Sequence, residues 1–135
     1  MMVVDASVIV KLLVAEPGTD LARAAVTADD HCIAPDLLMI EVAGALAKKM
    51  RFEGLPHSAA VAGLRNVPAF VERLVKSASL LGTATDLSIE LSHSLFDCLY
   101  LALAIERDCT VLTADRKFVA CADASGYGSN VSMLR

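Results

Sequence analysis

The chain has 135 residues, enough for one domain whose core buries about two thirds of the surface of the unfolded chain. Of its residues 56% are hydrophobic and only 4% are aromatic, which excludes a disordered chain and predicts a core of aliphatic side chains. The formal net charge of −4 argues against a protein that holds nucleic acid on a broad basic face.

In the first half of the chain, short β-branched runs alternate with segments of helical periodicity. The run Met2–Val4 ends at Asp5, after which a helical pattern begins. Glu53 and Gly54 end the longest helical pattern, for which Asp36 is the predicted N-cap. The elements expected in this half are strands at 2–4 and 32–34 and helices at 8–13, 20–26 and 36–50.

In the second half, the spacing of Ser94 and Asp97 is that of a capping box and predicts the start of a strongly apolar helix. Gly126 and Gly128 indicate a turn before the last strand. The elements expected in this half are helices at 58–65, 77–91, 94–107 and 116–120, a short extended piece at 70–71, and strands at 110–113 and 131–134.

Strands that are separated by helices and have nearly unbroken apolar interiors indicate an α/β fold, with a central parallel sheet flanked by helices on both faces. We expect this fold to form a single domain over residues 1–135. Ligands bind such sheets beyond the C-terminal ends of the strands. Asp5 and Asp115 follow two different predicted strands at that edge.

The apolar stretches are too charged to cross a membrane, because a span needs about 20 nearly uncharged residues and the two candidate runs contain Asp5 and Asp97. The N-terminus lacks the features of a signal peptide, so we expect a cytoplasmic protein. The four cysteines form no CxxC pair and the three histidines have no metal-ligand spacing. Reduced thiols that fill the core are therefore expected, rather than a zinc or redox site.

Two acidic residues stand in apolar surroundings that need an explanation. Asp5 could cap the following helix, but Ser7 could do so instead and leave Asp5 free for another role. Glu41 lies on the apolar face of its predicted helix, where a lone carboxylate costs several kcal/mol unless it is paired or binds a metal. The alternative for Glu41 is a salt bridge, for which Lys48 is a candidate.

Two further acidic residues follow in the second half of the chain. Asp97 could belong to the Ser94 capping box, yet its helix is apolar almost all round, which suits an acid directed into a site. Asp115 follows Thr113 at a strand end and could equally be a turn or cap residue. Four acids that converge on one crevice need a counter-cation, and Mg²⁺ or Mn²⁺ are the cations that prefer carboxylate oxygen.

The chemistry of such a cation is to lower the pKa of a bound water and to neutralise charge on a departing oxygen. Hydrolysis of a nucleic-acid phosphodiester fits this chemistry. The chain has no P-loop, no Gly-rich dinucleotide fingerprint and no GxSxG elbow, so nucleotide-cofactor and serine chemistry have no support.

Each acidic residue lies in a characteristic segment, and the segments occur in order along nearly the whole chain: Val3–Ile9, Ala34–Val42, Phe96–Ala104 and Leu112–Asp115. Together they resemble the PIN (PilT N-terminus) domain, and specifically the VapC-type toxins of bacterial toxin–antitoxin pairs. Each segment alone is unspecific, but the four in sequence with suitable spacing are a specific combination.

The resemblance implies a doubly wound PIN-domain fold and a site that uses Mg²⁺ or Mn²⁺. The catalytic and metal-binding residues would be Asp5, Glu41, Asp97 and Asp115, with Asp5 and Asp97 as core ligands and Ser7 and Thr113 as supporting hydroxyls. It also implies an endoribonuclease that cuts a tRNA or rRNA loop, a cognate VapB-type antitoxin whose tail fills the active-site groove, and a homodimer.

The chain departs from the resemblance at three positions. Similar toxins often carry a further acid two residues beyond Asp115, where this chain has Lys117, so the number of metal ions stays open. Ala6 and Cys98 replace the common Thr and Ala, and both are small changes. Residues that could contact RNA phosphates, or could simply be solvated helix ends, are Lys48, Lys49, Arg51, Arg116 and Lys117.

Three alternatives remain at this point. Tyr100 could stack on a base, although a core or dimer contact is the simpler interpretation. A response-regulator receiver is also acidic and binds Mg²⁺, but it needs a pair of adjacent acids after the first strand, where only Asp5 stands. A PIN-like domain that lost activity through Lys117 and only binds a partner is the other rival.

Overall fold

The computed structural model describes residues 1–135 and contains one five-stranded, all-parallel sheet. The strand order is β3-β2-β1-β4-β5, so the first strand lies in the middle. The strands are β1 (Met2–Val4), β2 (Cys32–Pro35), β3 (Arg73–Val75), β4 (Thr110–Thr113) and β5 (Val131–Met133). All of β2 and most of β1 and β4 are buried, as is usual for parallel strands covered on both faces.

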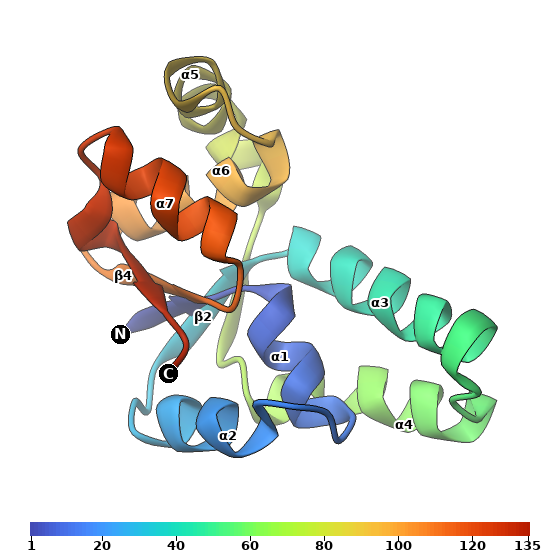
Figure 1. Ribbon diagram of the computed structural model, residues 1–135. Coiled ribbons are helices and arrows are strands. Elements are labelled where there is room, and N and C mark those ends of the chain that lie inside the picture. Colours follow the sequence, from blue (N-terminus) through green and yellow to red (C-terminus); the bar gives the residue numbers. More distant parts are fainter.

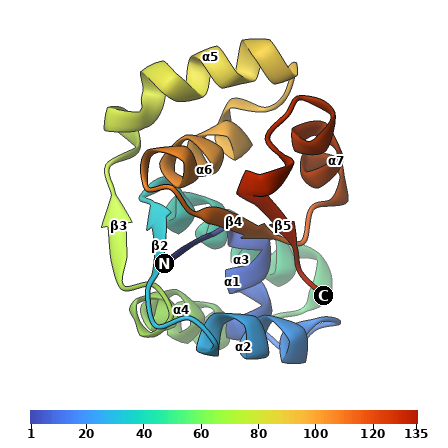
Figure 2. The same cartoon turned by 90° about the vertical axis from the view of Figure 1, so that its left-hand side faces the viewer.

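Helices cover both faces of the sheet, which confirms the predicted α/β fold. Figure 2 shows α1 to α4 on one side of the strands and α5 to α7 on the other. The helices are α1 (Ala6–Leu13), α2 (Thr19–Thr27), α3 (Leu37–Glu53), α4 (His57–Asn66), α5 (Leu81–Leu91), α6 (Leu95–Glu106) and α7 (Arg116–Ala124). Short 3₁₀ turns lie at Val67–Ala69, Ser77–Leu80 and Gly128–Asn130.

The helices α3 and α4 pack against each other and extend away from the sheet as an arm, which Figure 1 shows at the right of the molecule. At its far end α3 stops at Gly54, whose φ of 71° is in the left-handed region that glycine adopts readily. This end agrees with the predicted stop at Glu53 and Gly54.

The most enclosed helix is α6, which packs on the central strands β1, β2 and β4. Every residue from Cys98 to Ala104 is buried, so the helix can be apolar around most of its circumference. No single helix has the length and apolar composition of a membrane span; only the segment Ser77–Leu91 together with α6 meets that test, and the two are bent by 116° relative to each other.

All four cysteines are free thiols, as predicted. Cys32 and Cys98 are buried in the core, and Cys109 and Cys121 are half-buried against it. Their role as small apolar core residues is therefore confirmed.

The largest differences from the predicted elements lie in three places. The expected extended piece at 70–71 is wrong, because the strand is β3 at Arg73–Val75, a three-residue edge strand in which Arg73 and Leu74 are exposed. The expected helix 77–91 divides into a 3₁₀ turn and α5. The last helix, α7, continues beyond residue 120 to Ala124.

Asp36 is the N-cap residue of α3, as predicted, but it does not act through the expected side-chain bond. Asp36 precedes the helix, but its side chain makes no hydrogen bond to the helix amides. Its Oδ1 instead accepts a hydrogen bond of 3.0 Å from the backbone N–H of Ser77, and the Ser77 hydroxyl accepts one of 3.0 Å from the Leu37 N–H. The tertiary contact between two distant segments therefore replaces the local cap.

Candidate active site

Two neighbouring strands deliver polar residues to the same edge of the sheet. Val4 pairs with Leu112, so the residues that follow β1 and β4 emerge side by side. The Ser7 hydroxyl donates a hydrogen bond to Asp5 Oδ1 and accepts one of 3.0 Å from the backbone N–H of Ala114. Ser7 therefore ties the turn after β1 to the turn after β4.

Asp5 is the N-cap of α1, because its Oδ1 accepts hydrogen bonds from the backbone N–H groups of Ser7 (3.0 Å) and Val8 (3.4 Å). Of the two alternatives for this helix, the structure shows capping by Asp5 and not by Ser7. The Asp5 side chain is nevertheless buried, with 5% exposure, and burial raises its pKa to about 6. The hydroxyls of Ser7 and Thr113 oppose this rise.

Glu41 lies on α3 and is paired with Tyr100 of α6, whose phenolic O–H donates a hydrogen bond of 2.6 Å to Glu41 Oε1. The alternative of a salt bridge with Lys48 is not what the structure shows. Tyr100 is only 1% exposed, so it is a core residue and not a platform for a stacked base. Burial raises the pKa of Glu41 above its usual range, against the effect of the Tyr100 hydrogen bond.

Asp97, in the first turn of α6, accepts a hydrogen bond of 2.7 Å at Oδ2 from Nε2 of His93. Ser94 is the N-cap of α6, but its hydroxyl accepts from the Phe96 N–H rather than from the Asp97 N–H that a capping box uses. The predicted capping box is therefore wrong, and the Asp97 carboxylate bonds to His93 rather than back to Ser94. Burial raises the pKa of Asp97, and the His93 hydrogen bond opposes this.

Asp115 is the N-cap of α7, with Oδ1 accepting from the backbone N–H groups of Lys117 (2.9 Å) and Phe118 (3.3 Å). Its own N–H donates to the hydroxyl of Thr113, which is fully buried at the end of β4. The capping interpretation of Asp115 is therefore correct as local structure, and the Thr113 hydroxyl holds the backbone of the turn that carries Asp115.

Asp97 connects the other three acids electrostatically. Its charge raises the pKa of both Asp5 and Glu41, and the charge of Asp115 in turn raises the pKa of Asp97. The four carboxylates therefore share one neighbourhood, contributed by four different elements of the chain. Like charges in a partly buried site repel one another and favour a cation between them.

In this arrangement no three Asp, Glu, His or Cys side chains lie close enough together to hold one metal ion. Each carboxylate is turned toward its own hydrogen-bond donor. However, those bonds engage only one oxygen of Glu41, of Asp97 and of Asp115, so the second oxygen of each is not used by the protein. The donor set consists of carboxylate and hydroxyl oxygen, which fits Mg²⁺ or Mn²⁺ and not zinc.

Sequence reasoning missed two residues of this site, Tyr100 and His93. Tyr100 lies three residues after Asp97 on α6, a spacing that places the two side chains on one helix face, whereas His93 lies four residues before Asp97 in the turn that precedes α6. That spacing was the available signal. It does not by itself reveal that Tyr100 reaches Glu41 on another helix.

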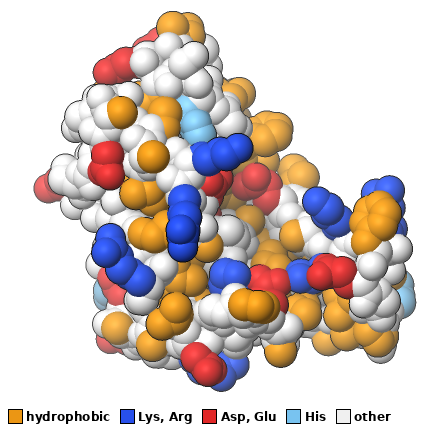
Figure 3. Space-filling view, in the orientation of Figure 1, with side chains coloured by type: hydrophobic (Ala, Val, Ile, Leu, Met, Phe, Trp, Pro, Cys, Tyr) orange, Lys and Arg blue, Asp and Glu red, His pale blue; other side chains and the backbone are white.

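Next to these residues is a cavity of 300 Å³ lined in part by Ser7, Lys11, Glu16, Glu41 and Ala114. Figure 3 shows acidic side chains within the hollow between the main body and the α3–α4 arm, and Lys and Arg side chains on both sides of it. An acidic centre with basic margins suits a phosphodiester chain that needs a cation at one point and phosphate contacts beyond it.

The five predicted phosphate-binding residues differ in the exposure of their side chains and in their ion pairs. Lys48, Arg51, Arg116 and Lys117 are exposed, and the guanidinium of Arg51 lies over the ring of Phe52. Lys49 is tied down instead: its ammonium contacts Glu16 at 2.6 Å and Glu53 at 3.5 Å, and its side chain is only 15% exposed. The expectation of a phosphate contact from Lys49 conflicts with these ion pairs.

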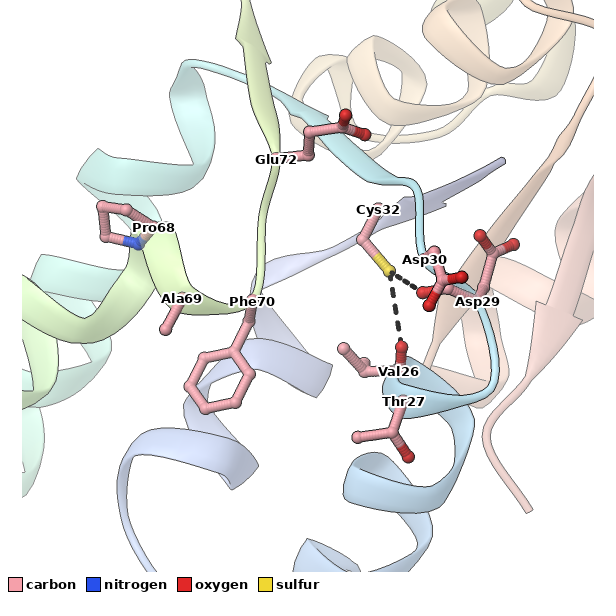
Figure 4. A pocket seen from close by; sticks show the side chains of 9 residues that line it. All are labelled: Val26, Thr27, Asp29, Asp30, Cys32, Pro68, Ala69, Phe70 and Glu72. Atoms are coloured by element: carbon pink, nitrogen blue, oxygen red, sulfur yellow. Dashed lines mark hydrogen bonds between the residues drawn. The ribbon is translucent and has the colours of Figure 1, made fainter.

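A larger cavity, of 460 Å³, lies elsewhere. Figure 4 shows that its lining residues come from the end of α2, the start of β2 and the segment before β3, and include Cys32, Phe70 and Glu72. These residues lie at the N-terminal edge of the parallel sheet, opposite the edge that carries Asp5 and Asp115. The cavity is therefore separate from the acidic residues.

A parallel α/β sheet with acidic residues at the C-terminal ends of its central strands defines a class of ligand-binding α/β domains. Within that class, the family model of the PIN domain matches residues 2–124, so this chain belongs to the PIN domain family. PIN domains are generally nucleases.

Two solved structures are similar to this chain. A Pyrobaculum aerophilum protein, PAE2754, superposes with a TM-score of 0.75 at 20% identity, over 98% of this chain and 90% of that one. The Mycobacterium tuberculosis toxin VapC20, described as cleaving the sarcin–ricin loop, superposes with a TM-score of 0.69 at 18% identity, over 89% of this chain and 94% of that one. No curated protein sequence matches. At these identities the two structures establish the fold.

Proposed function

We propose that this chain is a metal-dependent endoribonuclease that acts as the toxin of a toxin–antitoxin pair. The observation that carries the proposal is the position of Asp97, whose charge is coupled to those of Asp5, Glu41 and Asp115 at the C-terminal edge of a PIN-domain sheet. Three of these carboxyl groups have raised pKa values, so each is destabilised as an anion until a cation neutralises it.

The four acids are the proposed ligands of Mg²⁺ or Mn²⁺. When bound, the ion supplies Lewis acidity and makes a bound water a better nucleophile at neutral pH. The chain's own contribution is orientation: Ser7 and Thr113 hold the turns that carry Asp5 and Asp115, and Tyr100 holds Glu41. Lys48, Arg51, Arg116 and Lys117 are the proposed phosphate contacts at the margins of the hollow.

The substrate and partners follow from the same proposal. The likeness to VapC20 supports structured RNA, of the tRNA or rRNA kind, as the substrate. A VapB-type antitoxin would inactivate the toxin by filling the acidic hollow, and a basic side chain of its tail would neutralise the carboxylates in place of the cation. We further propose that the active toxin is a homodimer.

The direct test uses purified protein, freed of any antitoxin, and a pool of structured RNA with Mg²⁺ or Mn²⁺. We expect endonucleolytic cleavage that EDTA abolishes and that Asp97→Asn also abolishes. Asp86→Asn, on the exposed surface of α5, is the matched control and should cleave like the wild type. Cleavage that persists in EDTA contradicts the metal mechanism, and a complete lack of cleavage favours a domain that only binds a partner.

The toxin assignment has a separate test in cells. Expression of the chain alone should arrest growth, and co-expression of a small protein encoded next to it should relieve the arrest. The Asp97→Asn variant should not arrest growth. Equal growth arrest by wild type and variant would show that toxicity does not arise from the proposed site.

A further inference from the structure

His93 lies in the short turn between α5 and α6 and is held from several sides. Its backbone N–H donates to the Ser88 carbonyl (3.2 Å), and its carbonyl accepts from the Ser88 hydroxyl (2.5 Å). Its ring stacks on that of Phe118, with centroids 5.4 Å apart and planes 12° from parallel. Phe118 itself is fully buried, so the imidazole packs against a side chain of the core.

The direction of the imidazole is set by this packing. The preceding residue, Ser92, has a φ of 51°, in the left-handed region, and ends α5. The chain therefore reverses sharply and brings the ring over the first turn of α6, where Nε2 meets Asp97 Oδ2 at 2.7 Å. An ionised carboxylate only accepts hydrogen bonds, so the proton of a neutral His93 must be on Nε2.

A second histidine–carboxylate pair in the same chain lacks this support. His31 Nδ1 lies 2.9 Å from Glu72 Oε2, but the two side chains are 60% and 55% exposed, whereas those of His93 and Asp97 are 17% and 23% exposed. Exposed pairs of this kind hold neither partner firmly. The His31 pair is therefore an internal control for the His93 pair.

We propose that His93 is a positioning residue for metal binding: it engages Asp97 Oδ2 and holds the carboxylate in one orientation, so that Oδ1 would remain available to a divalent cation. This inference rests on the metal site of the proposed function and extends it to a residue outside the four acids. A carboxylate with a free torsion spends part of its time turned away from a cation. Outer groups that hydrogen-bond a ligand fix its orientation and raise the metal affinity.

The test measures binding of Mn²⁺ alone to metal-free, full-length protein by titration calorimetry, for wild type, His93→Leu, His93→Gln and His31→Leu. Gln carries an N–H donor at the same number of bonds from Cβ as His Nε2 but cannot stack in the same way. We expect His93→Leu to weaken Mn²⁺ binding by roughly 10- to 100-fold, and His93→Gln to recover most of the affinity. His31→Leu should bind like the wild type.

The outcomes separate this inference from the proposed function. If His93→Leu binds Mn²⁺ with wild-type affinity, the positioning role is overturned but the proposed metal site is not. If the Leu and Gln variants lose the same amount of Mn²⁺ affinity, the packing of the imidazole and not its N–H donor supports binding, and the proposed positioning through the hydrogen bond is overturned. Absence of Mn²⁺ binding by wild type overturns the proposed metal site itself. Denaturation of each variant in EDTA shows whether His93→Leu is folded; if it is not, the His93→Gln result decides.

Discussion

Asp5 should make the metal-free protein less stable at neutral pH, because its carboxyl group is buried and its pKa is raised to about 6. In the unfolded chain the same group ionises near 3.8. The folded protein therefore binds this proton more tightly than the unfolded chain does. Its stability falls as the pH rises from about 4 through about 6, and the loss is complete above that range.

The size of this effect follows from the two pKa values. One unit of pKa corresponds to about 1.4 kcal/mol, so the range from 3.8 to about 6 corresponds to about 3 kcal/mol at pH 7.5. Asp5→Asn removes the charge and keeps an oxygen that can accept the helix-capping hydrogen bonds. Because a buried amide has a cost of its own, we expect a net gain of about 1 to 3 kcal/mol.

The assay is urea denaturation in EDTA at pH 7.5 and pH 4. At pH 7.5 the Asp5→Asn variant should unfold at a higher urea concentration than the wild type, and at pH 4 the difference should nearly disappear. Addition of Mg²⁺ should stabilise the wild type but not the variant, because a ligand that binds only the folded state raises its stability.

Asp36→Asn is the control, because the contribution of Asp36 to stability changes with pH in the opposite direction to that of Asp5. Asp36 is exposed, and its hydrogen bond from the Ser77 N–H holds its pKa below the usual range. Its contribution to stability is present at neutral pH and is lost as the pH falls through that lowered pKa. The reasoning is refuted if Asp5→Asn destabilises the metal-free protein at pH 7.5, or if its effect is the same at both pH values.

Two further predictions concern neighbouring contacts. Tyr100→Phe should lower the free energy of unfolding at pH 7 by about 1 to 2 kcal/mol, because Glu41 loses a charge-assisted hydrogen bond. Urea denaturation should show that this loss shrinks as acid protonates Glu41. Equal stability of the two proteins at pH 7 would contradict the prediction. Lys49→Ala should lower the free energy of unfolding by roughly 1 kcal/mol, because it removes the ion pairs with Glu16 and Glu53. Lys48→Ala should leave stability unchanged and raise the KM for RNA. Denaturation and cleavage assays in which Lys48→Ala loses stability and Lys49→Ala raises the KM would contradict these two roles.

The alternation of strands and helices could be predicted from the sequence because it depends on local patterns. The buried strands at 2–4, 32–34 and 110–113 consist of apolar and β-branched residues, and they agree with β1, β2 and β4 to within one residue. The position of the edge strand β3 was not predicted, because the strand has only three residues and two of them are exposed, so it leaves no buried apolar run in the sequence.

Local capping rules were less reliable, because a cap can be replaced by a contact from elsewhere. Asp36 bonds to Ser77, which is 41 residues away in the sequence, and Asp97 bonds to His93 instead of the Ser94 backbone. For Asp36 the replacement is a tertiary contact between distant segments. For Asp97 it is a side chain only four residues away, in the turn before the helix.

The sequence by itself determined which segments carry acids and that two of them follow parallel strands, because strand order along the chain and apolar periodicity are local properties. Only the tertiary structure decided how those segments meet: Tyr100 reaches Glu41 across 59 residues, and Ser7 joins turns that are 107 residues apart. The physical reason is that packing between helices and strands, which no local pattern encodes, fixes the burial that raises the pKa of Asp5, Glu41 and Asp97 and brings the phenol of Tyr100 to Glu41.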